Sequence, residues 1–438
     1  MYGVVGGGME YPMICWNGPR PEKDGTYSAR TKYFLIGVVI HEVGHNYFPM
    51  IVNSDERRWA WMDEGLNTFL QYLTEQEWEE NFPSRRGEPQ DIVGYMRSSQ
   101  QVPIMTNSES ILQYGPNAYS KPATALNILR ETILGRELFD KAFKTYSRRW
   151  KFKHPEPADF FRTMEDASGR DLDWFWRGWF YTTDHVDMGI ENLRVYTVDA
   201  GDPVDRENRL RAEEEAEPVT LSARRNKPLP KRLDEFPELA DFYNSYDELK
   251  ATDRQIKTYK QFIDGLNEDQ LRLLKNDLKF YLIDVTNDGG LPMPVILKLT
   301  FADGSTEEVR LPAEIWRANN RKITKLLLRK KTIEKVELDP NRETADVDRE
   351  DNMLPRELVQ SRFKLFKSRS SSNPMQDAKR AEARAAREKA LKERAEKADK
   401  EKAEKEAAEA EAEDAAETDE DSEDEEDDAE TDGESSDG

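Results

Sequence analysis

The sequence predicts a multidomain protein with a mainly helical first part, a further helical segment, a small β-sandwich-like domain and a disordered acidic C-terminal tail. Three observations support this fold class. Apolar residues recur at helical spacing as far as about residue 190. Strict alternation of apolar and polar residues, typical of half-buried strands, replaces that spacing between residues 279 and 339. The segment from Glu411 to Gly438 contains seventeen acidic residues and no lysine or arginine.

The first part of the chain contains a series of predicted helices. Residues 29–49 (ARTKYFLIGVVIHEVGHNYFP) are apolar on nearly all sides and predict a buried helix that ends near Pro49. Residues 59–78 (WAWMDEGLNTFLQYLTEQEW) predict a second helix. A third is predicted over residues 117–135, with Pro122 near its start and Gly135 after its end. Further helices are predicted for RELFDKAFKTYSRRW, PADFFRTMEDASG and DLDWFWRGWFYT.

These patterns divide the chain into four regions. Residues 1–190 are predicted to form a catalytic domain, for reasons given below, and residues 191–240 a charged linker or exposed insertion. Residues 241–345 are predicted to contain a helical segment followed by the β-sandwich-like domain. Residues 346–438 form a low-complexity Ala/Glu/Lys/Arg segment and the acidic tail.

The strands of the third region are predicted for KFYLIDVTN, PVILKLTFADGSTEEVRLP, ITKLLLR and TIEKVELD, with a hairpin turn at Asp303-Gly304. Residues 376–410 have the composition of a solvated helix. Leu391 is the only large aliphatic residue there, so apolar heptad positions are missing and a coiled coil is excluded. The acidic run that follows has no large apolar residues with which to build a core, and it is predicted to be disordered.

Composition excludes several classes of protein. The formal net charge is −23, but outside the acidic tail it is only −6, and no basic stripe suggests a nucleic-acid partner. No apolar run is long enough for a transmembrane segment, and the first residues do not have the pattern of a signal peptide. Cys15 is the only cysteine, so intramolecular disulfides are excluded. Localisation is left open between an exported (periplasmic) parent protein and the cytoplasm, and the oligomeric state is unknown.

A metal site is indicated by residues 39–49 (VIHEVGHNYFP), in which His41 and His45 stand four apart and Glu42 follows the first. With four histidines in the chain, this pair is expected by chance roughly 0.03 times, and less often still with an acidic neighbour. On a helix both imidazoles lie on one face and can reach one ion. A catalytic zinc site needs a third protein ligand and an open position, so another ligand must come from elsewhere.

Glu64, in WMDEGLNTF, follows His45 after eighteen intervening residues. This arrangement, HExxH and then W-x-x-E-G, resembles the gluzincins of the aminopeptidase N type, zinc peptidases with a thermolysin-like catalytic domain. The resemblance implies one Zn²⁺ per chain, bound by His41, His45 and Glu64. It also implies that Glu42 takes a proton from the attacking water and passes it to the leaving amine.

The resemblance extends in both directions from this motif. Upstream, VGGGMEYP is similar to the family's G-x-M-E-N stretch, with matches at Gly7, Gly8, Met9 and Glu10, while Tyr11 replaces the usual asparagine. This implies an edge strand whose Glu10 binds the free α-amine of the substrate. Downstream, NAYSKPATAL resembles the family's Y-x-K-(G or P) stretch, which implies that Tyr119 donates a hydrogen bond to the oxyanion. Tyr114 is the competing candidate for that role.

The sequence therefore predicts a zinc-dependent aminopeptidase that acts on peptides with a free N-terminus. An endopeptidase on the same scaffold is one alternative, and it would not need Glu10. A truncated, non-catalytic protein that binds zinc or peptide is another, although intact Glu42 and Tyr119 argue against it. The family's large N-terminal β-domain would precede residue 1, so the chain is expected to be an N-terminally truncated member. The ligand set is complete without His154 and His185, which are expected to be structural or exposed.

Overall fold

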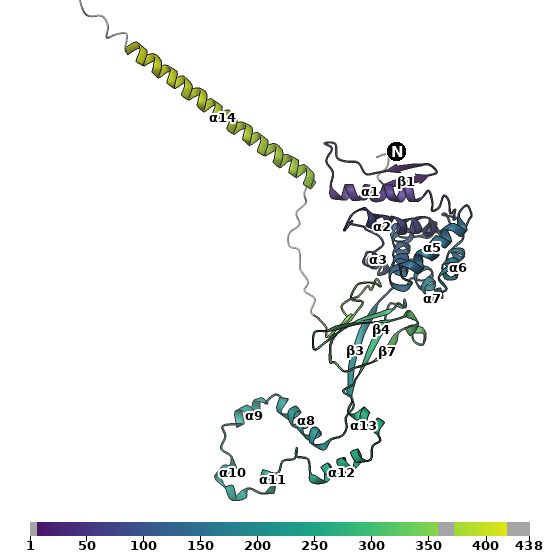
Figure 1. Cartoon of the computed structure of the whole chain (residues 1–438), viewed down its shortest axis with the longest axis vertical. Coiled ribbons are helices and arrows are strands. Elements are labelled where there is room, and N and C mark those ends of the chain that lie inside the picture. The colour runs from purple at the N-terminus through teal and green to yellow at the C-terminus, as the bar shows by residue number, and fades with distance from the viewer. Residues whose placement is uncertain (1–6, 358–371, 418–438) are drawn as a thin grey trace, which may run out of the picture. The chain divides into compact units, whose positions relative to one another are not determined.

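The computed structural model describes residues 7–357 and 372–417, and Figure 1 labels its helices and strands. The chain divides into two compact units. The first consists of Met1–Met9, Ile14–Val39 and Phe363–Gly438, and the second of Glu10–Met13 and Ile40–Arg362. Strand β1 (Gly8–Tyr11) and helix α1 (Ala29–Gly44) each contribute residues to both units.

The first unit contains a small sheet and two helices. Strand β1 (Gly8–Tyr11), which begins in this unit, and β2 (Ile14–Asn17) form a two-stranded sheet. Helix α1 (Ala29–Gly44) also begins here, and α14 (Pro374–Glu417) is the long helix near the C-terminus. All side chains from residue 377 to residue 412 are exposed, so this stretch of α14 has no buried face.

Ion pairs along α14 follow helical spacing, for example Lys397 with Glu401 and Lys402 with Glu406. The predicted solvated helix is therefore confirmed. It extends to Glu417, so it includes the first seven residues of the segment predicted to be disordered. The remainder of that segment, residues 418–438, lies outside the described residues.

The helical part of the second unit surrounds an aromatic core. Trp61 packs against Phe160, Phe161 and Phe180 at ring-centroid distances of 4.9–5.7 Å. None of the described helices combines the length and apolar character needed to cross a bilayer. The helices are η1 (Trp61–Gly65), α2 (Leu66–Trp78), α3 (Pro89–Met96), η2 (Ser108–Ser110), η3 (Gly115–Ser120), α4 (Lys121–Ile128), η4 (Leu129–Ile133), α5 (Arg136–Trp150), α6 (Pro157–Ser168), α7 (Asp173–Trp176) and η5 (Arg177–Tyr181).

The predicted helices of this part are found with one difference in length. The second predicted helix is the continuous pair η1–α2, and the third is the continuous run η3–α4–η4. Helix α1, however, ends at Gly44 rather than near Pro49. The chain turns after Gly44, where the Met50 amide donates to the His45 carbonyl and closes the turn. His45 therefore lies just beyond the helix that carries His41.

Two antiparallel sheets follow the helices, and all predicted strands are confirmed. The first has the order β3-β4-β7, formed by Met188–Thr197, Lys279–Asn287 and Lys322–Arg329. The second has the order β6-β5-β8-β9, formed by Thr306–Leu311, Val295–Phe301, Ile333–Leu338 and Met353–Leu354. Gly304 has a φ of +77°, which glycine adopts without strain in the β5–β6 turn, and the short helix η7 (Ala313–Arg317) follows β6. Apolar side chains of both sheets join the helical part in one buried cluster.

A long insertion separates two neighbouring strands of the first sheet. Thr197 at the end of β3 pairs with Lys279 at the start of β4, so residues 198–278 leave and return at the same point. The predicted boundary between residues 190 and 191 falls inside β3, because that strand belongs to the sheet as a whole. The insertion contains α8 (Pro203–Ala216), α9 (Leu221–Asn226), α10 (Arg232–Glu235), η6 (Pro237–Leu239), α11 (Phe242–Ser245), α12 (Asp253–Asp264) and α13 (Glu268–Leu274).

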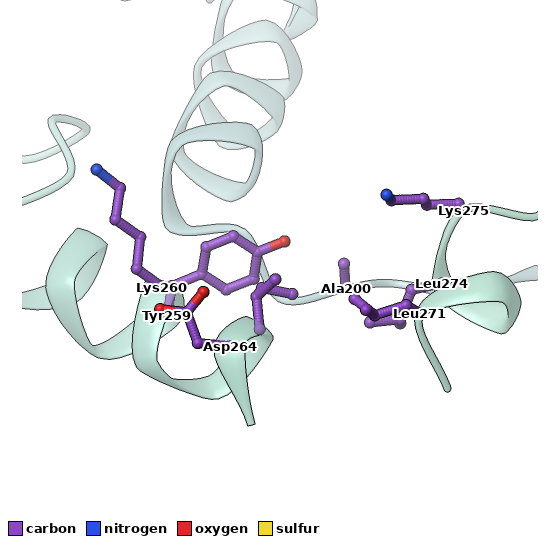
Figure 2. A pocket seen from close by; sticks show the side chains of 8 residues that line it. Ala200, Tyr259, Lys260, Asp264, Leu271, Leu274 and Lys275 are labelled. Atoms are coloured by element: carbon purple, nitrogen blue, oxygen red, sulfur yellow. The ribbon is translucent and has the colours of Figure 1, made fainter. Parts of the chain in front are cut away.

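A hollow of about 270 Å³ lies within this insertion, at α12 and α13 (Figure 2). Tyr259, Leu271 and Leu274 line it together with the charged residues Lys260, Asp264 and Lys275. No histidine or cysteine is among the lining residues, and one carboxylate faces two lysines. The hollow therefore does not have the ligand types that a zinc site requires.

Candidate active site

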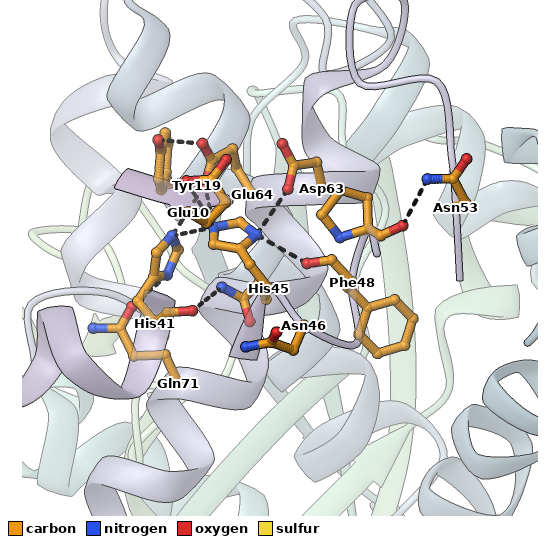
Figure 3. Close-up of polar contacts among 12 residues, drawn as sticks. Glu10, His41, His45, Asn46, Phe48, Asn53, Asp63, Glu64, Gln71 and Tyr119 are labelled. Carbon is orange, nitrogen blue, oxygen red and sulfur yellow. Dashed lines mark hydrogen bonds and ion pairs between the residues drawn. The ribbon is translucent and has the colours of Figure 1, made fainter. Parts of the chain in front are cut away.

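The three predicted metal ligands converge on one point in the second unit (Figure 3). His41 Nε2 lies 3.0 Å from His45 Nε2 and 3.0 Å from Glu64 Oε2. The third distance, from His45 Nε2 to Glu64 Oε2, is 3.3 Å. All three residues are buried, and His45 is fully buried. The two helical segments α1 and η1–α2 thus place three ligand atoms within one coordination sphere.

The other ring nitrogens determine the tautomers of both histidines. His41 Nδ1 lies 2.9 Å from Gln71 Oε1, and Gln71 uses its amide nitrogen to donate to Glu75. His45 Nδ1 lies 2.9 Å from the Phe48 carbonyl oxygen. Because both partners are acceptors, each Nδ1 carries a proton, and in the neutral form of each ring Nε2 presents a lone pair. Two lone pairs and a carboxylate oxygen therefore face one another, which is unfavourable without a cation between them.

These distances fit a zinc ion. Zinc binds histidine nitrogen and carboxylate oxygen at about 2.0–2.1 Å in tetrahedral geometry, which places neighbouring ligand atoms roughly 3.3 Å apart. The observed separations of 3.0, 3.0 and 3.3 Å are close to that value. Glu42, the acidic residue between the histidines, is not part of the triplet. His41, His45 and Glu64 would therefore hold the metal.

The surroundings of the two histidines shift their pKa values in opposite directions. Burial lowers the pKa of His45, but hydrogen bonds and charge from Asp63 and Glu64 raise it more, so the net shift is upward. Asp63 Oδ1 lies 2.9 Å from His45 Nδ1. For His41, burial dominates and lowers the pKa despite the contact with Glu64. The neutral form of His41 is therefore the favoured one, which is the form that binds a metal.

Close backbone packing positions Glu64. A Cβ on the next residue, Gly65, would lie 2.5 Å from Pro122 Cγ and 3.0 Å from the Ala118 carbonyl oxygen, so only glycine allows η1 to approach η3 and α4 this closely. Asn67 Nδ2 donates to the His41 carbonyl at 2.7 Å and ties α2 to α1. The two helical segments that carry the ligands are thus held together by contacts next to the ligands themselves.

Glu42 is buried beside the ligand triplet with an unused acceptor. It is 5% exposed, and its Oε2 atom has no hydrogen-bond partner among the described residues. Burial raises its pKa to about 8, and the charges of Glu10 and Glu64 contribute to this rise, while His45 opposes it. Ligand-forming atoms of Glu42, Glu10 and His45 lie within 4.8 Å of one another. A carboxylate in this state is suited to accept a proton near neutral pH.

Of the two candidate tyrosines, the structure places Tyr119 at the triplet. Its hydroxyl donates to Glu64 Oε1 at 2.5 Å, and its ring stacks on His41 at a centroid distance of 5.7 Å. Burial and the charge of Glu64 raise its pKa, so it remains a protonated donor at neutral pH. Tyr114 is 43% exposed, and its ring meets Tyr119 edge-on at 6.1 Å.

Among the predicted substrate-binding residues, Glu10 lies at the site. Its Oε2 atom is 4.0 Å from His45 Nε2, and its side chain is 15% exposed. Gly7 precedes β1, and Gly8 and Met9 are the first residues of that strand. These three residues belong to the first compact unit, and no atom lies within 4 Å of a Cβ built on Gly7.

Several residues that lie at the site were not predicted from the sequence. Asp63 is buried against His45, and its position directly before Glu64 was an available signal. Gln71, seven residues after Glu64 in α2, orients His41. Carboxylates of Glu10, Glu56 and Asp63 also approach within 4.8 Å of one another, and no motif pointed to Glu56. His154 is exposed and bonds the Asn53 carbonyl, while His185 forms a bridge with Gly290, as expected for residues outside the ligand set.

Comparison with known proteins gives one family. Residues 20–179 match the peptidase family M1 domain. The glutamyl aminopeptidase of Sus scrofa is 26% identical over 175 residues, which cover 37% of this chain and 18% of the relative. Aminopeptidase 2, mitochondrial, of Saccharomyces cerevisiae is 27% identical over 143 residues, covering 31% and 15%. Aminopeptidase N of Lactococcus lactis subsp. lactis is 25% identical over 166 residues, covering 36% and 19%.

The chain thus spans less than a fifth of the length of each of these relatives. The segment that matches the family domain contains the ligand triplet, Glu42 and Tyr119, whereas Glu10 precedes it. The segment from residue 20 to residue 179, which carries the ligand triplet, is therefore that of a peptidase family M1 domain.

Proposed function

We propose that this chain hydrolyses N-terminal peptide bonds as a zinc-dependent aminopeptidase. The observation that carries the proposal is the convergence of His41 Nε2, His45 Nε2 and Glu64 Oε2 within 3.3 Å of one another. A buried carboxylate with an unused acceptor, Glu42, lies next to these three atoms. These three residues would hold a zinc ion, which when bound would supply Lewis acidity to activate water.

Other side chains at the site have separate proposed roles in the reaction. Glu42 accepts a proton from the attacking water and delivers it to the leaving nitrogen, a role that its raised pKa of about 8 supports. Tyr119 donates its hydroxyl proton in a hydrogen bond to the carbonyl oxygen as negative charge develops there. Asp63 and Gln71 hold the imidazole rings of His45 and His41 in orientation.

The carboxylates of Glu10 and Glu42 at the site support an aminopeptidase rather than an endopeptidase. Glu10 lies beside Glu42 and His45, and its carboxylate is partly exposed. A carboxylate in this position forms a charge-assisted hydrogen bond with a protonated α-amine. An endopeptidase, which cuts inside a peptide, has no such amine to bind. Peptides with a free N-terminus are therefore the proposed substrates.

The test compares one peptide with its N-acetylated copy on this chain. Acetylation removes the positive charge that Glu10 is proposed to bind, which costs on the order of 2–5 kcal/mol. The free peptide should therefore have a kcat/KM that is higher by roughly 30-fold or more. Glu10→Gln should narrow this ratio by slowing hydrolysis of the free peptide. Equal cleavage of both peptides at internal bonds would replace the aminopeptidase with an endopeptidase.

A further inference from the structure

Arg86 presents an unpaired guanidinium beside the candidate active site. It lies in the loop between α2 and α3, and its Cζ atom is 4.4 Å from the centre of the Tyr119 ring. The residue is half-buried. No hydrogen bond or ion pair joins its guanidinium to any residue that the structure describes. Five N–H donors are therefore left for water or a ligand in a partly desolvated position.

The carboxylates nearest to Arg86 are already engaged. The charges of Glu64 and Glu75 act on Arg86, but neither is paired with it. Glu64 contacts both histidines and Tyr119. Both oxygens of Glu75 accept hydrogen bonds, from Gln71 at 2.7 Å and from Ser84 at 2.6 Å. Arg86 is thus a cation that the chain itself does not neutralise by direct contact.

A purely structural role explains only part of this arrangement. A guanidinium over an aromatic face gains about 0.5–2 kcal/mol, so Arg86 stabilises the position of the Tyr119 ring. The ring offers no nitrogen or oxygen acceptor to the N–H groups of Arg86, and no residue that the structure describes offers one either. A partly buried cation with free donors is costly to maintain, and a planar fork of donors matches a carboxylate.

We propose that Arg86 binds a carboxylate of the peptide substrate beside the bond that is cut. The proposal rests on the proposed peptidase function and names a substrate class for the same site. The charges around the site are separated in a way that suits such a substrate. Glu10, Glu42 and Asp63 gather at His45, whereas Arg86 lies at Tyr119. A peptide with an ammonium at one end and a nearby carboxylate complements both groups.

The carboxylate has three sources, and matched peptide pairs distinguish them. Glu-Ala-Ala-amide against Gln-Ala-Ala-amide tests the side chain of the first residue. Ala-Glu-Ala-amide against Ala-Gln-Ala-amide tests the second residue, and Ala-Ala-Ala against its C-terminal amide tests the terminal carboxylate. One pair should favour the acidic member by about tenfold or more, the range of a hydrogen bond between charged groups.

Three variants separate binding of a carboxylate from other roles. Arg86→Met should reduce the preferred acidic-to-neutral ratio to near one, and Arg86→Lys, which keeps the charge but loses the fork, should give an intermediate ratio. Arg85→Met is the matched control, because Arg85 is the exposed neighbour in the same loop, and it should leave the ratio unchanged. Arg86→Met removes the contact with Tyr119, so the melting temperature of this variant is compared with that of the parent. If Arg86→Met does not fold, the acidic-to-neutral ratio of Arg86→Lys tests the proposal instead.

The ratio of acidic to neutral peptide is measured in two ways. On the parent chain it is the ratio of the kcat/KM values, and on the Glu42→Gln variant it is the ratio of the Kd values from calorimetry. Failure to hydrolyse any of these peptides would overturn the proposed function, while the Kd ratio would still test Arg86. Hydrolysis without an acidic preference in any pair would overturn the inference alone. A uniform loss of kcat for acidic and neutral peptides in Arg86→Met would do so as well, because it would show that Arg86 acts only by positioning Tyr119.

Discussion

At the scale of single residues, the site contains buried polar atoms without partners among the residues that the structure describes. Such atoms lower the stability of the fold, but they are available to bind a metal or to accept a proton. The Oε2 atom of Glu42 is buried without a partner among the described residues, which costs about 1–3 kcal/mol. The Nε2 atoms of His41 and His45 face each other at 3.0 Å with their lone pairs. Both arrangements become favourable only when a cation and a water enter the site. Individual substitutions should therefore separate metal binding from turnover.

Replacing His45 with alanine should abolish tight zinc binding, because two ligands do not make a closed site. Glu42→Gln should keep the zinc and lose nearly all turnover, since the amide cannot accept the proton. Zinc per chain is measured by elemental analysis, and turnover with a free-amine peptide. His154→Ala is the control, because that histidine is exposed and bonds only a backbone carbonyl in the structure. Full zinc content in His45→Ala would contradict the ligand assignment.

Tyr119→Phe should lower kcat by about 10²–10³ with little change in KM, the pattern of a contact made mainly in the transition state. The hydroxyl is the only group removed, so the ring contacts with His41 and Arg86 remain. Tyr114→Phe is the matched control, and steady-state kinetics on one peptide compares the two variants. A large loss in Tyr114→Phe with Tyr119→Phe unaffected would mean that the hydroxyl of Tyr114 acts instead.

At the scale of elements, the close approach of η1 to η3 and α4 sets the distance between Glu64 and Tyr119. Gly65 provides this approach, since a side chain there would overlap Pro122 and the Ala118 carbonyl. A proline ring and a backbone carbonyl cannot turn away as a flexible side chain can. The geometry of the site therefore depends on the absence of a single methyl group one residue after a metal ligand.

Gly65→Ala should lower the free energy of unfolding by about 1–3 kcal/mol, because a methyl group is forced into a filled space. It should also reduce kcat by moving Tyr119 relative to Glu64. Urea unfolding gives the stability change. Gly94→Ala in α3 is the control: a Cβ there has no atom within 4 Å, and alanine favours a helix by roughly 0.5–1 kcal/mol. Equal stability of the two variants would show that η1 can shift at no cost.

At the scale of the whole molecule, the insertion between β3 and β4 is separate from the sheet it interrupts. Thr197 and Lys279 are antiparallel partners, so the strands need only a short turn between them. Most side chains from residue 198 to residue 278 are exposed, and none contributes to the main buried cluster. The candidate site draws its residues from other parts of the second unit.

Deleting residues 198–278 and joining the strands with Asn-Gly should leave zinc content and peptidase activity within a few-fold of the parent. The melting temperature should change by only a few degrees, because little apolar surface is lost. A scanning calorimeter and the free-amine peptide assay measure both quantities. Loss of zinc binding in a protein that still unfolds cooperatively would show that the insertion supports the site.

The sequence by itself determined the elements and the ligand pattern. Helical spacing and strand alternation are local properties, so the helices around His41 and Glu64 and all strands from β4 to β8 could be predicted from nearby residues. The HExxH motif is local as well. Only tertiary structure decided which side chains from distant segments meet at the ligands. Arg86 and Glu56 reach the site because loops fold back onto it, and the continuity of β3 with its sheet depends on pairing with a strand eighty residues away. Such contacts depend on packing between segments, and no short-range pattern in the sequence encodes them.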